Sequence, residues 1–144
     1  MIEQDTVKLL RECDAGIKMG VASIDDILDH VKDENLKNIL TDNKNKHEAL
    51  RGETESLLSS YHDDGKEPNL MAKTMSHMKT NMKMGLDYSD ETISDLLTDG
   101  CNMGVKSLSR YLNQYAAADE PSKDITKRLI KLEESLAVDL RDYL

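Results

Sequence analysis

Phenylalanine and tryptophan are both absent from this 144-residue sequence, and five tyrosines are its only large aromatic residues. A core without them has to be built from Leu, Ile, Val, Met and Ala, a composition that suits helices better than a sheet. Proline is also scarce, and the two present, Pro68 and Pro121, leave room for long helices. The composition therefore predicts an all-α protein, with one domain spanning residues 1–144.

Long apolar runs and an excess of basic residues are also missing. No stretch reaches the roughly 20 apolar residues of a membrane-spanning helix, and the first residues do not resemble a signal peptide. The net charge of −9 opposes binding to nucleic acids and to anionic membranes. The two cysteines, Cys13 and Cys101, are too few for a disulfide framework. We therefore expect a cytoplasmic protein with free thiols that binds neither nucleic acid nor membrane.

Apolar residues recur with steps of three and four in four long segments, which is the spacing of helices in a bundle. The first segment is expected to begin near Asp5 or Thr6, either of which can cap a helix. A very short link at 32–33 follows, and such a link makes two long helices antiparallel neighbours. The second segment is expected to end near Gly65, a left-handed stop with Pro68 just beyond it.

The second pair of helices is expected to begin at Ser89, a good cap, and at Pro121, which suits a first helical turn. A long connection, 62–89, separates the two pairs and lets the third helix run parallel to the second. Within it, methionines with steps of four, three and four residues predict a short amphipathic crossover helix. These methionines are Met71, Met75, Met78 and Met82.

The methionine stripe has two interpretations. Flexible thioether side chains suit packing against the core or against a protein partner, so this face is the expected interaction surface. Together with His77, the same side chains suit Cu(I), and a copper site remains the alternative. A row of small residues, Gly100, Gly104 and Ser107, leaves space that a methionine of the crossover could fill.

Polar residues interrupt the apolar seam of the second segment at Asn43 and His47. In metal-carrying four-helix bundles ligands project into the core at this level: one Glu from each of two helices and a Glu-x-x-His pair from each of the others. Here Lys44 stands three residues before His47, and the fourth segment supplies only Glu133 and Glu134. The sequence predicts no cofactor and, at most, an atypical metal site at His47, Glu133 and Glu134.

The preferred interpretation of His47 is a core histidine that is hydrogen-bonded to Asn43, Glu133 or Glu134. A buried polar group without a partner would cost about 1–3 kcal/mol. We also expect Lys44 to pair with Glu133 or Glu134, so that an ion pair replaces a metal-bridged link.

Several short motifs accompany this order of helices: Cys13 followed by Gly16-Ile17-Lys18, the turn Gly65-Lys66-Glu67-Pro68, and the step Asp99-Gly100. With two helices, a long crossover and two further helices, the chain resembles the ferritin-like superfamily. More narrowly, it is similar to a group of uncharacterised bacterial four-helix-bundle proteins, a domain of unknown function. The resemblance implies a ferritin-like bundle with a crossover helix and no particular activity, because fold does not determine function.

The leading functional interpretation is a non-enzymatic cytoplasmic bundle that has lost the di-metal site. It would act through protein–protein contacts with an unknown partner or through self-association. No grouping typical of a nucleophilic enzyme and no phosphate-binding glycine loop can be assigned in the sequence. The alternative is a metal-binding ferritin-like protein that stores or oxidises iron or manganese with an unusual ligand set.

Overall fold

The computed structural model describes residues 2–67 and 88–144, and these residues form helices and connecting loops without any strand. The helices are α1 (Ile2–Leu28), α2 (Glu34–Ser60), α4 (Asp90–Gln114) and α5 (Glu120–Leu140), followed by the 3-10 turn η1 (Arg141–Tyr143). The predicted all-α bundle is thus confirmed. Outside the described residues lie the predicted crossover helix and Met71, Met75, His77, Met78 and Met82.

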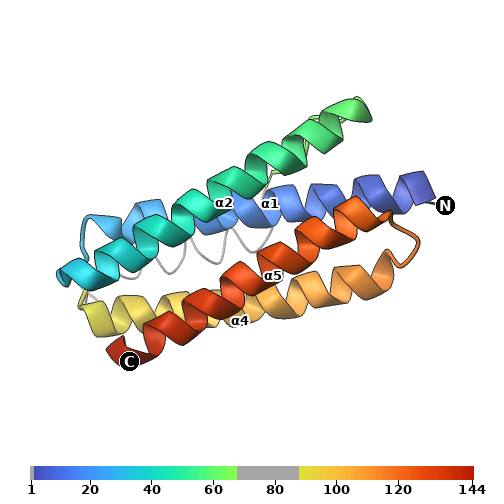
Figure 1. The fold of residues 1–144 in the computed structure, drawn as a ribbon. Coiled ribbons are helices and arrows are strands. Elements are labelled where there is room, and N and C mark those ends of the chain that lie inside the picture. The colour runs from blue at the N-terminus through green and yellow to red at the C-terminus, as the bar shows by residue number, and fades with distance from the viewer. Residues whose placement is uncertain (1, 68–87) are drawn as a thin grey trace.

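Two antiparallel hairpins lie side by side in the bundle (Figure 1). One consists of α1 and α2 and the other of α4 and α5, and within each hairpin the two helices pack closely. α2 and α4 start at the same end of the bundle and run in the same direction, as the length of their connection predicts (Figure 1). α5 packs against both α1 and α2, whereas the contact between α1 and α4 is looser.

Three helices begin at side-chain caps. Asp33 accepts from the Leu36 N–H at 2.9 Å, and Ser89 accepts from the Thr92 N–H at 3.1 Å. At the start of α5 the cap is Asp119, and Pro121 lies in the first turn as predicted. Each of these oxygens satisfies an N–H group that has no partner within its own helix.

The predicted caps of the first helix have another role. α1 already begins at Ile2, so Asp5 and Thr6 lie inside the helix. Asp5 Oδ2 accepts from the Ala117 N–H at 3.1 Å, and Thr6 Oγ1 accepts from the Asp119 N–H at 2.8 Å. Both side chains therefore hold the α4–α5 loop, which reaches the same end of the bundle.

The predicted stop of the second helix is also in a different place. α2 ends at Ser60, and His62, with a φ of 58°, is the left-handed residue that follows its cap. The Asp63 N–H then donates to the Leu58 carbonyl at 3.0 Å, which closes the helix end. Gly65 is left-handed as well, with a φ of 91°, but it lies in the loop beyond the helix.

Two apolar clusters fill the bundle, one toward each end. The first contains Ile24, Ile27, Val31, Leu36, Leu40, Ile93, Leu97, Cys101, Leu136 and Leu140. The second contains Leu10, Cys13, Ile17, Val21, Leu50, Leu58, Leu108, Ile125 and Leu129. On α2 the polar seam position His47 falls between Leu40 and Leu50, so the two clusters meet at a polar level. Across the ranges that the structure describes, no helix is long and apolar enough to cross a bilayer.

Candidate functional site

His47 is the polar centre of the bundle. Its side chain is only 1% exposed. Nδ1 lies 2.9 Å from the Asn43 backbone carbonyl oxygen, and Nε2 lies 2.8 Å from Glu133 Oε1. The expectation of a core histidine paired with Asn43 and Glu133 is therefore confirmed, and both ring nitrogens have a protein partner.

Glu133 sets the protonation of this histidine. Burial of the imidazole acts to lower the pKa of His47, since a charged ring is poorly solvated there. The hydrogen bond and the negative charge of Glu133, together with the Asn43 carbonyl, outweigh burial and raise the pKa of His47 above its ordinary value of 6.5. The pair therefore favours an imidazolium that donates one proton to the carbonyl and one to the carboxylate.

Lys44 and Glu134 do not join this pair. Lys44 Nζ contacts Asp25 Oδ1 of α1 at 2.5 Å, and Glu134 is exposed on α5. The expected ion pair between Lys44 and Glu133 or Glu134 is thus wrong. The physical reason is the helical turn: Lys44 is one residue beyond Asn43, so its side chain points about 100° away from the core seam. The same displacement separates Glu134 from Glu133.

Both cysteines are buried and free. Burial raises the pKa of the Cys13 thiol to about 12, and its Sγ lies 3.1 Å from Thr126 Oγ1. Burial also raises the pKa of the Cys101 thiol, and the charge of Glu133 together with a hydrogen bond to it adds to the increase. Both thiols therefore stay protonated near neutral pH and are poor nucleophiles. The contact between Cys101 and Glu133 gives no signal in the sequence, because the two residues lie on different helices and meet only when α4 and α5 pack together.

His47 and Glu133 fall short of a ferritin-like ligand set. Within residues 2–67 and 88–144, no group of three His, Cys, Asp or Glu side chains is placed to hold a metal ion. The di-metal bundles use six protein ligands. Of the three residues predicted as metal ligands, the fold brings together His47 and Glu133 and leaves Glu134 at the surface.

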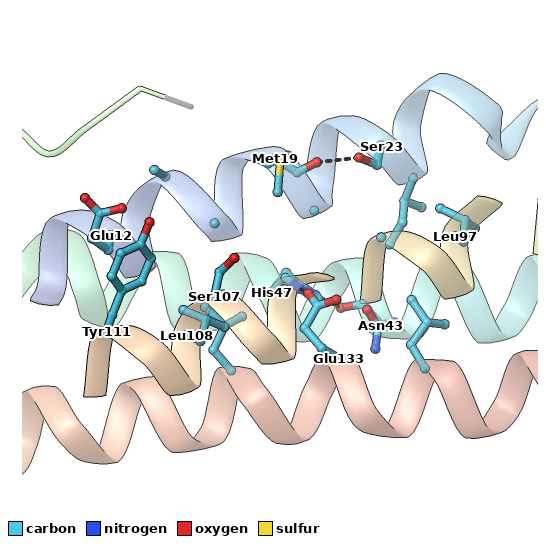
Figure 2. A pocket seen from close by; sticks show the side chains of 18 residues that line it. Glu12, Met19, Ser23, Asn43, His47, Leu97, Ser107, Leu108, Tyr111 and Glu133 are labelled. Atoms are coloured by element: carbon cyan, nitrogen blue, oxygen red, sulfur yellow. Dashed lines mark hydrogen bonds and ion pairs between the residues drawn. The ribbon is translucent and has the colours of Figure 1, made fainter. Parts of the chain in front are cut away.

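A pocket lies beside the His47–Glu133 pair, between α1 and α4 (Figure 2). Glycines border it on both helices, Gly16 and Gly20 on α1 and Gly100 and Gly104 on α4. The other lining residues described are Glu12, Ala15, Met19, Ser23, Ile24, Asn43, His47, Leu97, Ser107, Leu108, Tyr111, Leu129, Glu133 and Leu136. The row of small residues predicted on the third segment thus lines this pocket. The expected methionine beside it lies outside the described residues.

Asn43 adds an unpaired acceptor to this region. Its Nδ2 donates to the Leu132 carbonyl at 3.2 Å, which fixes the orientation of the amide. Its Oδ1 is buried without a hydrogen-bond partner in the described part of the molecule. Native proteins satisfy most such atoms, so an orphan acceptor beside a pocket needs an explanation.

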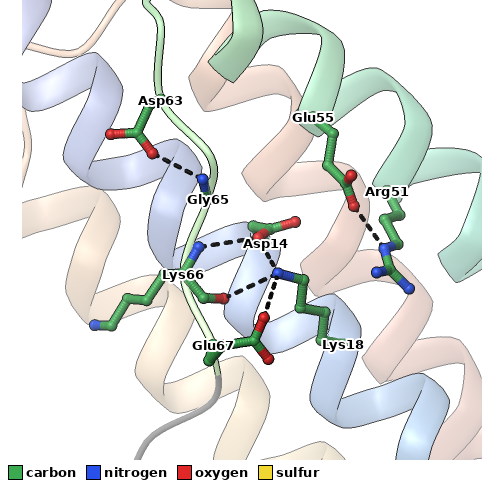
Figure 3. A network of polar contacts seen from close by, with 8 residues as sticks. All are labelled: Asp14, Lys18, Arg51, Glu55, Asp63, Gly65, Lys66 and Glu67. Atoms are coloured by element: carbon green, nitrogen blue, oxygen red, sulfur yellow. Dashed lines mark hydrogen bonds and ion pairs between the residues drawn. The ribbon is translucent and has the colours of Figure 1, made fainter.

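A second buried polar cluster surrounds Asp14, whose side chain is fully buried on α1 (Figure 3). Asp14 Oδ2 accepts from the Lys66 N–H at 3.0 Å and lies 2.9 Å from Lys18 Nζ. Lys18 Nζ also lies 3.2 Å from Glu67 Oε1. These contacts fasten the loop after α2 onto α1. The turn at 65–67 was noticed in the sequence, but Asp14 was not, because it carries no motif of its own.

The candidate site therefore consists of the His47–Glu133 pair, the Asn43 acceptor and the adjoining pocket. The three residues belong to α2 and α5, and the pocket walls come mainly from α1 and α4. Comparisons of the chain with protein-family models, with curated proteins and with solved structures found no match.

Proposed function

We propose that this chain is a non-enzymatic, ferritin-like four-helix bundle that has lost its di-metal site and acts through contacts with a protein partner or with a second copy of itself. The observation that carries the proposal is the hydrogen bonding of His47. In a metal-ligating histidine one nitrogen binds the ion and the other donates to a carbonyl or carboxylate. Here Nδ1 has the Asn43 carbonyl oxygen at 2.9 Å and Nε2 has Glu133 Oε1 at 2.8 Å, so both ring nitrogens have a protein partner.

The state of the buried thiols supports a non-enzymatic role. A nucleophilic cysteine needs a depressed pKa and access to substrate. Cys13 and Cys101 are both buried, and burial raises the pKa of each thiol. Free thiols and a net charge of −9 also suit a cytoplasmic protein that binds neither nucleic acid nor membrane.

Two measurements on the purified protein test the proposal. The first is elemental analysis after incubation with iron, manganese, zinc and copper, where we expect less than about a tenth of an equivalent of each metal. The second is the molar mass from light scattering over a range of concentrations. A mass that rises with concentration indicates self-association, and a constant monomer mass directs the search to other proteins.

A metal-binding protein of the ferritin-like type is the second candidate, because imidazole, carboxylate and amide oxygen meet at one level. His47 and Glu133 contact each other, and Asn43 Oδ1 next to them has no described partner. One or two tightly held equivalents of iron or manganese that disappear in both His47→Ala and Glu133→Gln would favour this candidate. Retention of metal in both variants would place the ion elsewhere.

A further inference from the structure

We propose that the solvent-facing side of α4 pairs with the same side of a second copy of this chain, with the two α4 helices antiparallel. This inference rests on the self-association named in the proposed function and assigns a surface to it. The exposure, the order and the signs of the charges along α4 carry the inference.

The exposed residues of α4 form a stripe along one side of the helix. They recur with steps of three and four residues, which places them on one helix face. The buried residues Leu97, Cys101 and Leu108 lie on the opposite side, toward the core. The central part of the stripe is exposed throughout and consists of Asp95, Asp99, Asn102, Met103, Lys106 and Arg110.

The charges along this stripe separate by sign. Asp95 and Asp99 lie in its N-terminal half, and Lys106 and Arg110 lie in its C-terminal half. The midpoint falls just before Met103. Asp99 and Lys106 are equally far from it, and so are Asp95 and Arg110. Reversing the direction of the helix therefore puts a base at the height of each acid.

Within a single helix this order of charges is unfavourable. Asp95 and Asp99 are four residues apart, and so are Lys106 and Arg110, and like charges at this spacing destabilise a helix slightly. The helix dipole favours acids only within the first turn, and Asp99 lies well beyond that turn. The helix itself therefore does not explain the pattern.

The other helices place their charges differently. On α2, Lys46 lies 3.0 Å from Asp42, and on α5, Arg128 lies 2.9 Å from Asp124. Both pairs join opposite charges four residues apart, which stabilises a helix. On α4 the same spacing joins like charges, and a partner with the reverse order of charges would compensate for their repulsion.

A second copy supplies such a partner. In a pair related by a twofold axis the same patch meets itself. Asp99 then faces Lys106 of the second copy, Asp95 faces Arg110 of the second copy, and each contact occurs twice. Met103, whose side chain is 40% exposed, lies next to the axis and would bury apolar surface there.

The overall charge limits the strength of this dimer. A net charge of −9 opposes the approach of two copies. At an ionic strength of about 0.15 M, charges more than about 8 Å apart are largely screened, whereas directly opposed pairs still attract. One helix face is also a small interface compared with those of permanent dimers. We therefore expect a weak, reversible dimer.

The first test is sedimentation equilibrium of the full chain at concentrations up to about 1 mM. Lys106→Glu/Arg110→Glu makes the stripe acidic throughout, and we expect it to raise the dissociation constant at least about tenfold, because each attractive pair becomes repulsive. Lys8→Glu/Lys46→Glu is the matched control, with the same change of net charge at exposed positions of α1 and α2. We expect it to change the dissociation constant by less than about threefold.

Mixing two variants tests the complementarity of the stripe. Asp95→Lys/Asp99→Lys makes the stripe basic throughout, and alone it should dissociate as readily as the acidic variant. An equimolar mixture of the acidic and basic variants should restore association at least to the level of the unmodified chain, since each stripe then faces its opposite.

Crosslinking tests the orientation of the pair. Met103→Cys places a thiol beside the expected axis, and Asn113→Cys places one toward the end of the same helix. Both native cysteines are buried, so the new thiol reacts first. A short bis-maleimide should join two copies of Met103→Cys but not of Asn113→Cys, whose thiols would lie about 30 Å apart along an antiparallel pair. This result does not depend on the folding of the charge variants.

Four results would overturn the proposal. A chain that stays monomeric up to about 1 mM would leave a different protein as the partner of this face. Association that the acidic variant keeps, or that the control weakens equally, would place the interface elsewhere. A mixture that does not associate would exclude charge pairing, and equal crosslinking of both thiol variants would exclude an antiparallel pair. Tight metal binding, by contrast, would contradict the proposed loss of the di-metal site and leave the pairing of α4 intact.

Discussion

The two buried polar clusters of this bundle differ in the space beside them. Beside Asp14 the loop after α2 lies close: a Cβ atom built on Gly65 would clash with Asp14 Oδ2, so the loop is packed against the carboxylate. Around His47 the packing is tight on the side of Gly20, whereas no described atom lies within 4 Å of a Cβ atom built on Gly100. Both clusters bury charge, and the pocket between α1 and α4 adjoins the His47 cluster.

The two clusters also differ in what they connect. Asp14 joins two parts of the chain that are 52 residues apart, and its second oxygen, Oδ1, is buried without a partner among the described residues. The His47–Glu133 pair joins α2 to α5 and leaves an acceptor and a pocket next to it. Burial of polar groups alone is therefore a weak indicator of function in this bundle.

The largest expected effect comes from removing the Asp14 carboxylate. Asp14→Ala leaves the Lys66 N–H and the Lys18 ammonium without their buried acceptor. We expect the free energy of unfolding to fall by about 3 kcal/mol, measured by urea denaturation. Asp25→Ala is the matched control on the same helix, because Asp25 pairs with Lys44 at the surface, and its removal is expected to cost much less than the removal of Asp14. Equal losses in the two variants would contradict a structural role for Asp14.

The next effect tests how tightly the loop is pressed against Asp14. Gly65→Ala places a side chain on a residue with a φ of 91° and directs it at the carboxylate. We expect a loss of about 2 kcal/mol from backbone strain and crowding, again measured by urea denaturation. Gly52→Ala, on an exposed and open face of α2, should instead be neutral or slightly stabilising. A neutral Gly65→Ala would show that the loop can move away from α1.

His47→Gln tests the second cluster, and its effect should depend on pH. Because Glu133 raises the pKa of His47 above 6.5, the folded state binds the proton more tightly than the unfolded state. The stabilisation is complete below 6.5 and is lost as the pH rises through the folded pKa. We expect His47→Gln to cost about 1–2 kcal/mol at about pH 5.5 and clearly less at about pH 9. A cost that does not change with pH would mean that the pair is not charged.

The smallest effects compare the two sides of the pocket. Gly100→Ala adds a helix-favouring methyl group at a position where no described atom lies within 4 Å, and it should stabilise by about 0.5–1 kcal/mol. Gly20→Ala gains the same propensity, but its methyl group meets the His47 ring, which is held by Glu133, so we expect a net loss. Thermal unfolding of both variants checks the sign. Two stabilising substitutions would show that the histidine has room to shift.

Local features of the bundle were predictable from the sequence. Ser89 caps α4, Pro121 lies in the first turn of α5, and Asn43 and His47 occupy the buried seam of α2. Each follows from neighbours within one or two turns of the same helix. The same reasoning predicts Gly65 as the stop of α2, but the helix ends at Ser60 and the left-handed residue after its cap is His62. Capping preferences rank several adjacent residues as candidates and do not select among them.

The partners of the candidate site were only partly predictable. The bond from His47 to the Asn43 carbonyl spans four residues of one helix, and the bond to Glu133 was one of the expected options. Lys44 was assigned to the wrong partner because the spacing gives a residue's angle around its own helix, and Asp25 becomes its neighbour only when α1 packs alongside. The pocket beside Gly100 likewise depends on the distance at which α1 and α4 pack.

The sequence by itself determined the helices, the faces they bury and the level at which polar groups enter the core, because these depend on apolar periodicity and on contacts within a few residues. Only the tertiary structure decided that Asp14 accepts a hydrogen bond from the Lys66 N–H and that Glu133 contacts the His47 ring. It also decided that glycines of α1 and α4 line one pocket. These groups come from segments distant in the chain, and their meeting follows from the packing of whole helices.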